Sequence, residues 1–266
     1  LHLLPSSVAH NKPIGIGAGV IVDPFGLVSE VSQVKSFGIE PIPNLTIDGR
    51  GALVMIYHRV MDMAKEIIRS RGGRVIGTTA GGIGPTYSDV ADRSVIRISD
   101  LNHLDRFMEL IRKRLEEKTK LFKAMGLDME EWKHIFIELT QKEVKANQRL
   151  ICLGLAKEED FDYTDFVQVG DEIGFNVKAV CNAYERVAKE ICSWRVIGDV
   201  SAMLHKMVIG GSQVLIEGAQ GAQLDKIFGT FPYVTSSSTL SGGACVGLGI
   251  GPTMISEVRG IAKAYT

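Results

Sequence analysis

No excess of either charge marks this chain of 266 residues, which carries 30 Lys and Arg against 31 Asp and Glu. Nucleic-acid binding usually leaves a basic patch or stripe in a sequence, so this balance excludes an overall basic field. The charged fraction of 23% and the hydrophobic fraction of 45% are ordinary for a soluble globular protein. We therefore expect function to lie in local sites and expect no nucleic-acid partner.

Cysteine is scarce, and its four residues are far apart: Cys152, Cys181, Cys192 and Cys245. Disulfide frameworks and zinc sites need closer spacing, so we expect buried free thiols of a reducing compartment and no metal site. The six histidines are also scattered, and none stands at nucleophile spacing from a Ser or Cys. The most notable of them, His58, falls on a helical pattern and is expected to be structural.

Long apolar runs are missing too. The first five residues are too short an apolar run for a signal peptide and have no basic region before them. The stretch from Ile227 to Ser256 has no charged residue, but two prolines and six glycines exclude an apolar spanning helix. We expect loops that lie close to a ligand or to another part of the molecule, in a cytoplasmic protein without a membrane partner.

Strand patterns alternate with helical patterns, which predicts an α/β fold with a mainly parallel sheet. Strands are expected at residues 14–22, 45–47, 75–76 and 214–217. Helices are expected at 27–38, 53–70, 104–126, 176–194 and 199–211, with another that Asp128 caps and a short one at Pro252. No internal repeat or low-complexity linker occurs. We expect one domain over residues 1–266, with a helical elaboration at about 102–194.

The first of two glycine-rich stretches, residues 77–87, follows a predicted strand. Ligands of α/β sheets collect at the carboxyl ends of strands. Glycines let backbone N–H groups approach an anion, and the neighbouring threonine hydroxyls add donors. Arg93 could supply a charge-assisted contact to the same phosphate. These residues equally allow a plain connecting loop whose glycines serve tight turns.

The second stretch begins with a predicted strand at 214–217 and continues through glycines to residue 238. Gln220 has an amide that donates and accepts together, which suits the edge of a purine. Thr235 and the three serines that follow it form a dense group of hydroxyls. Turn and cap chemistry is the alternative explanation for such a Ser/Thr run.

The two stretches together resemble the signatures of adenylosuccinate synthetases. Residues 77–87 are similar to GTTxRGIGPAY, and residues 217–237 are similar to EGAQGxxLDxxxGTYPxVTSS. Their order and separation agree with the family, while residues 102–194 are only weakly alike. The resemblance implies a P-loop-NTPase-related α/β fold with a mainly parallel sheet and an inserted helical block. It also implies a homodimeric, GTP-dependent carbon–nitrogen ligase of AMP biosynthesis.

The resemblance implies roles for four residues. Thr79 and Thr235 look like the threonines that hold the 5′-phosphate of inosinate (IMP). Arg93 looks like the arginine that reaches this phosphate across the dimer interface, and Gln220 is similar to the glutamine that faces the base. In the family, GTP with Mg²⁺ first phosphorylates the 6-oxygen of inosinate. The amine of L-aspartate then displaces that phosphate.

The family's GDEGKGK loop, catalytic aspartate and catalytic histidine fall before Leu1 in this resemblance. Its aspartate-binding and guanine-recognition segments fall after Thr266. The resemblance thus assigns no catalytic residue and no ligand of GTP or Mg²⁺ to these 266 residues. We expect them to carry the inosinate-binding part and to show no turnover alone. The alternative is a non-catalytic nucleotide-binding or oligomerisation module of a diverged homologue.

Several positions depart from the family pattern. Gly81 stands where arginine is usual, and Val90 where lysine is usual. Ile227 and Phe228 replace an acidic residue and a histidine. These changes leave fewer charged groups around the expected inosinate pocket.

Overall fold

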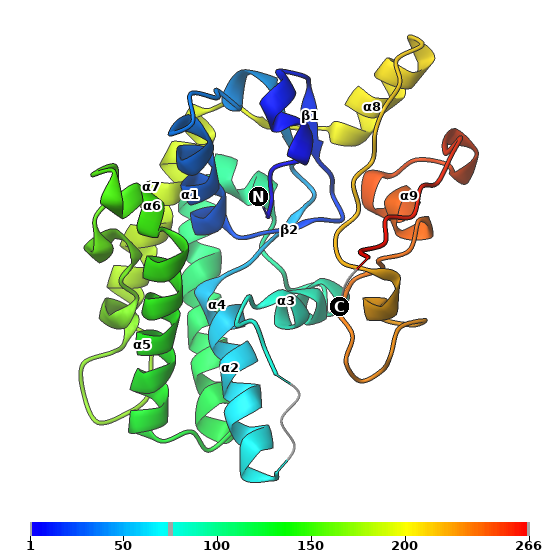
Figure 1. The fold of residues 1–266 in the computed structure, drawn as a ribbon. Coiled ribbons are helices and arrows are strands. Elements are labelled where there is room, and N and C mark those ends of the chain that lie inside the picture. Colours follow the sequence, from blue (N-terminus) through cyan, green and yellow to red (C-terminus); the bar gives the residue numbers. More distant parts are fainter. Residues whose placement is uncertain (1, 74–76, 265–266) are drawn as a thin grey trace.

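The computed structural model describes residues 2–73 and 77–264. Its strands form two parallel groups, and Figure 1 shows helices packed around them. The larger sheet has the order β1 (Ile14–Ile16), β3 (Leu45–Asp48) and β5 (Ile197–Gly198), and the smaller pairs β2 (Ile21–Val22) with β4 (Ala52–Leu53). The predicted α/β fold with a mainly parallel sheet is confirmed.

The predicted strand at 14–22 is wrong in its middle part, where the chain leaves the sheet. The N–H of Val20 donates to the carbonyl of Gly17 at 3.0 Å and closes a turn. The N–H of Gly19 donates to the carbonyl of Gly247 at 2.8 Å, and a Cβ at Gly19 would lie 2.5 Å from the Cα of Gly247. Because two backbones touch here, the strand is divided into β1 and β2.

The helices outside residues 102–194 are α1 (Pro24–Lys35), α2 (Ile56–Arg71), α3 (Ile83–Ala91), α8 (Val200–Ile209) and α9 (Gly242–Leu248). Helix α2 begins at Ile56 and not at Leu53, because Leu53 belongs to β4. Short 3-10 turns occur at Ser6–His10, Ile42–Asn44, Ile98–Asn102, Glu158–Phe161, Thr164–Phe166, Ala222–Leu224 and Pro252–Met254. The last confirms the short helix predicted at Pro252.

The helical block consists of α4 (Leu104–Ala124), α5 (Met129–Ala146), α6 (Gln148–Cys152) and α7 (Val177–Ser193), on the left of Figure 1. Helix α4 packs on α7 and α2, and α7 packs on α1. The carboxylate of Asp128 accepts the N–H of Glu131 and caps α5 as predicted. The block and the larger sheet share one buried core, which supports the proposal of a single domain.

Four aromatic rings fill the centre of this block. The ring of Trp132 lies 5.2 Å from that of Phe122, 5.3 Å from Phe136 and 5.1 Å from Phe175, measured between centroids. The indole N–H donates to the carbonyl of Gly174 at 3.1 Å. Trp132 is therefore fully buried, and its one polar atom has a hydrogen-bond partner.

The segment 212–264 lies on the other side of the molecule, where Figure 1 colours it orange to red. The strand predicted at 214–217 is wrong: these residues form no regular element, and Leu215 is 87% exposed. A strand needs a neighbour for its backbone groups, and no described residues pair with this run. The strand predicted at 75–76 lies outside the described residues.

The cysteines are free, but only Cys181 is buried, and Cys152 is exposed. The prediction that the thiols are buried is therefore correct only for Cys181. Across residues 2–73 and 77–264, no helix has the length and apolarity needed to cross a membrane.

Candidate functional site

The first glycine-rich stretch divides into a loop, residues 77–82, and the helix α3. The prediction of a loop as far as residue 87 is thus wrong in its second half. Pro85 is compatible with the helix because the N–H groups of the first turn have no intrahelical partner. Helix α3 therefore presents its amino end directly behind the glycines.

Helix α2 holds this loop from one side. The N–H of Gly77 donates to Glu66 Oε1 at 2.7 Å, and the N–H of Gly82 donates to Asp62 Oδ2 at 3.1 Å. Arg59 Nε donates to the carbonyl of Ala80 at 3.2 Å. The N–H groups of both glycines are thus occupied by carboxylates. The idea that they cradle an anion is wrong at these two positions.

Gly82 lies against the first turn of α2 with a φ of +70°. A Cβ at this position would lie 2.9 Å from the backbone nitrogen of Arg59 and 3.0 Å from the carbonyl carbon of His58. Both are backbone atoms of a helix and cannot move aside cheaply. Glycine is required here for its conformation and for its lack of a side chain.

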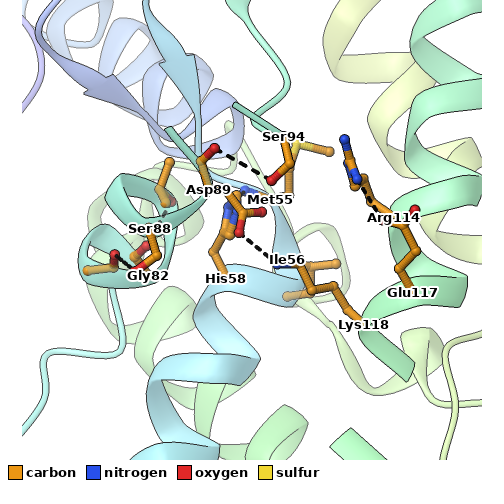
Figure 2. Close-up of polar contacts among 12 residues, drawn as sticks. Met55, Ile56, His58, Gly82, Ser88, Asp89, Ser94, Arg114, Glu117 and Lys118 are labelled. Atoms are coloured by element: carbon orange, nitrogen blue, oxygen red, sulfur yellow. Dashed lines mark hydrogen bonds and ion pairs between the residues drawn. The ribbon is translucent and has the colours of Figure 1, made fainter. Parts of the chain in front are cut away.

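His58 connects α2 to α3, as Figure 2 shows. Its Nδ1 accepts the N–H of Met55 at 2.9 Å, so Nε2 carries the proton and donates to Asp89 at 3.0 Å. Lys118 Nζ donates to the other oxygen of Asp89 at 2.7 Å. Burial lowers the pKa of His58, although Asp89 acts in the opposite direction. The imidazole is buried and neutral, which agrees with the expected structural role.

Acidification should therefore weaken the fold through His58. An unfolded imidazole takes up a proton near about pH 6.5, whereas burial keeps the pKa of folded His58 lower. Below that pH the unfolded state binds more protons, so the free energy of unfolding should fall as the pH decreases. Above it, this contribution is fully present.

Urea unfolding between about pH 5 and 7.5 measures this effect. The His58→Gln variant should depend less on pH than the wild type over this range. His134→Gln is the matched control, because the His134 side chain is 64% exposed. An unchanged pH dependence in His58→Gln would contradict the assignment.

Arg93 ends α3 in the left-handed region, with a φ of +61°. Its N–H donates to the carbonyl of Val90 at 3.1 Å, and the N–H of Ser94 donates to that of Asp89 at 2.9 Å. This arrangement usually has glycine at the position of Arg93. The residue is exposed and lines a cavity of about 440 Å³ that Arg97, Arg106 and Arg114 also line.

Thr79 precedes the amino end of α3, whereas Arg93 lies at its carboxyl end. A helix of nine residues is about 13 Å long. The described contacts therefore do not bring Arg93 to Thr79 within one chain. Thr79 itself is exposed, and its hydroxyl lies 3.4 Å from a Cβ built at Gly81.

A buried carboxylate organises the second stretch. Asp225 accepts the N–H groups of Ile227 at 2.9 Å, Phe228 at 3.1 Å and Thr239 at 2.9 Å. These backbone hydrogen bonds, led by Ile227 and Phe228, lower the pKa of Asp225. Sequence reasoning did not single out this residue. Its position as an acid just before a long uncharged run was the available signal.

The second stretch reaches the first at the amino end of α3. The Ser236 hydroxyl lies 3.2 Å from the position that a Cβ of Gly84 would occupy. Thr235 is half-buried beside it, and its N–H donates to the carbonyl of Leu224 at 2.9 Å. Gln220 is exposed with a φ of +67°, and the contacts of the described residues do not bring it to Thr79.

Comparison with known proteins gives a match to the whole chain. The sequence profile of the family described as adenylosuccinate synthetase matches residues 1–153 and 139–266. The chain belongs to the adenylosuccinate synthetase family. It is 39% identical to the adenylosuccinate synthetase of Clostridium botulinum strain 657 and 38% identical to that of Clostridium acetobutylicum. Each match covers 100% of this chain and 51% of the relative.

A solved structure agrees with the family. The fully ligated adenylosuccinate synthetase from Plasmodium falciparum is similar with a TM-score of 0.72 and 25% sequence identity. The similarity covers 96% of this chain and 48% of that one. The chain thus spans about half the length of the adenylosuccinate synthetases that it matches.

The positions that depart from the family signatures are mostly at the surface. Val90 is 38% exposed, Ile227 is 70% exposed and Phe228 is 77% exposed. Gly81 is half-buried. Three apolar side chains therefore face solvent where the family signatures have charged or polar ones.

Proposed function

We propose that this chain supplies the inosinate-binding part of an adenylosuccinate synthetase. The complete enzyme joins inosinate to L-aspartate with GTP and forms adenylosuccinate. The observation that carries the proposal is the contact between the two signatures, where Ser236 lies against Gly84 at the start of α3. The amino end of a helix offers unpaired N–H groups and a positive dipole, which favour a phosphate.

Within this proposal, Thr79 and Thr235 bind the 5′-phosphate from the two signatures, and Gln220 faces the purine. Arg93 acts on the phosphate of the partner subunit in a homodimer. Its exposed place at the far end of α3 supports this role, because the helix separates it from Thr79 in its own chain. Its charge then completes a site that neither subunit forms alone.

In the part of the chain that the structure describes, no group of three or more His, Cys, Asp or Glu could hold a metal ion. From the resemblance to the family signatures, we propose that the ligands of Mg²⁺ and GTP belong to parts of the enzyme outside these residues.

Loss of one phosphate contact should weaken inosinate binding strongly. A hydrogen bond to a charged group is worth roughly 1.5–3 kcal/mol, so Thr235→Ala should raise the Kd about ten- to a hundredfold. Arg93→Leu should raise it at least as much, with a smaller effect in high salt because Arg93 is exposed. Inosine has no phosphate and should bind poorly to all variants.

Calorimetric titration with inosinate and inosine measures these constants. Thr164→Ala is the matched control, because Thr164 is exposed on the helical block. Equal affinity for inosine and inosinate, or an unchanged Kd in Thr235→Ala, would show that the phosphate roles are wrong. Inosinate binding by a complete protein that forms no adenylosuccinate would favour the non-catalytic module.

A further inference from the structure

One face of α2 contacts the loop 77–82 and the helix α3 that follows it. His58, Asp62 and Glu66 are spaced by four positions, which places them on the same side of a helix. Glu66 accepts the N–H of Gly77, Asp62 accepts the N–H of Gly82, and His58 donates to Asp89. The start of the loop, its end and the body of α3 are thus each held by one residue of this row.

We propose that Asp62 and His58 are positioning residues for the anion site at the amino end of α3. They set the conformation of the loop 77–82 and the direction of α3 before any ligand binds. The donors that remain at the helix start, and the hydroxyl of Thr79, then need no rearrangement. The identity of the anion as the inosinate phosphate rests on the proposed function, but the positioning itself does not.

The charge of Asp62 is the first argument. A carboxylate close to an anion site repels the ligand. Asp62 should therefore serve the site through a contact with the protein and not with the ligand. Asp62 accepts the N–H of Gly82, whose backbone is pressed against α2. Because Gly82 immediately precedes Ile83, this bond fixes the point at which α3 begins.

The neighbouring side chain completes the hold on the loop. Arg59 follows His58 in the same turn of α2 and donates to the carbonyl of Ala80 at 3.2 Å. An acceptor of the loop backbone at Ala80 and a donor at Gly82 are therefore both engaged by α2. A loop held in this way has lost its conformational freedom before binding, which reduces the entropic cost of association.

The attachment of α3 is the second argument. Asp89 lies in the second turn of α3 and uses one oxygen for His58 and the other for Lys118 of α4. Its pKa is lowered: burial acts against the charge, but the hydrogen bonds from His58 and Lys118 outweigh it. Helix α3 is therefore tied to two helices by a single ionised side chain, as Figure 2 shows.

Substitutions at Asp62 distinguish a role in positioning the loop 77–82 from a general contribution to the stability of the fold. In Asp62→Ala the amide of Gly82 should exchange its hydrogen about ten- to a hundredfold faster, because it loses a bond to a charged group. The Kd for inosinate should rise about tenfold or more. Asp62→Asn keeps an acceptor at the same distance, so the exchange rate of Gly82 and the Kd for inosinate should both stay close to the wild-type values. Lys65→Ala, on the same helix but outside these contacts, should change neither.

The measurements are hydrogen exchange by NMR, calorimetry with inosinate, and thermal unfolding. Unchanged Gly82 exchange in Asp62→Ala, or identical behaviour of the Ala and Asn variants, would overturn the proposal. If Asp62→Ala does not fold, Asp62→Glu keeps the charge but displaces the acceptor, and should still accelerate the exchange of Gly82. Normal exchange in a folded Asp62→Glu would then refute the inference.

The two proposals fail in different ways. A wild-type protein that binds no inosinate would refute the proposed function and leave the exchange results to decide the role of Asp62. Inosinate binding that is equally tight in wild type and Asp62→Ala, with faster exchange of Gly82, would refute positioning for the ligand. The proposed function would then stand.

Discussion

The free energy of unfolding of the Arg59→Leu variant should be about 3–5 kcal/mol lower than that of the wild type. Removing one partner from a buried ion pair leaves the other charge uncompensated. Arg59 is 6% exposed, and its guanidinium donates to Glu143 at 2.7 Å and lies 3.8 Å from Asp23. Burial acts against this charge, but Tyr163, Asp23 and Glu143 outweigh it and raise the pKa of Arg59.

Denaturant unfolding measures the loss, with Arg106→Leu as the control. The Arg106 side chain is 69% exposed and lies 3.7 Å from Asp100, so its removal should cost less than about 1 kcal/mol. The double variant Arg59→Leu with Glu143→Leu should recover part of the stability, because it also removes the carboxylate of Glu143, which the single variant leaves without its partner. A single variant within about 1 kcal/mol of the wild type would contradict the prediction.

Trp132→Ala should cost a similar amount, about 3–5 kcal/mol, because a large buried ring is replaced by a cavity. Trp132 has no exposed surface and contacts the rings of Phe122, Phe136 and Phe175. The carbonyl of Gly174 also loses its donor. Denaturant unfolding followed by circular dichroism measures the change without relying on tryptophan fluorescence.

Trp194→Ala is the matched control, because Trp194 is only half-buried at the end of α7. It should cost clearly less than Trp132→Ala, since less apolar surface returns to solvent. Equal losses in the two variants would show that the four-ring cluster is not the centre of the helical block.

The helices could be predicted from the sequence because their signals are local. Asp128 and Asp199 accept backbone N–H groups at the start of α5 and α8, and Gly126 follows α4 with a φ of +72°. The strands were less predictable because pairing depends on distant residues. The run at 14–22 is divided by a contact with Gly247, and the run at 214–217 has no neighbour among the described residues.

The candidate site was predictable to a similar degree. Both signatures could be located from their glycines and hydroxyls, and the structure brings them together at Gly84. The role of α2 could not be foreseen, since nothing near Asp62 in the sequence indicates that its carboxylate takes the N–H of Gly82. The family resemblance implied that Arg93 acts across an interface, but the residues alone did not predict its separation from Thr79, because 83–87 were expected to be loop and are helix.

The left-handed conformation at the end of α3 has a cost in stability. Arg93 adopts a φ of +61°. This conformation destabilises a residue that has a side chain by about 1–2 kcal/mol and glycine by almost nothing. An Arg93→Gly variant should therefore be more stable than the wild type by about 1 kcal/mol. The proposed contact of Arg93 across the dimer interface would offset this cost, and a screen for thermostability of the chain alone would be expected to replace the arginine.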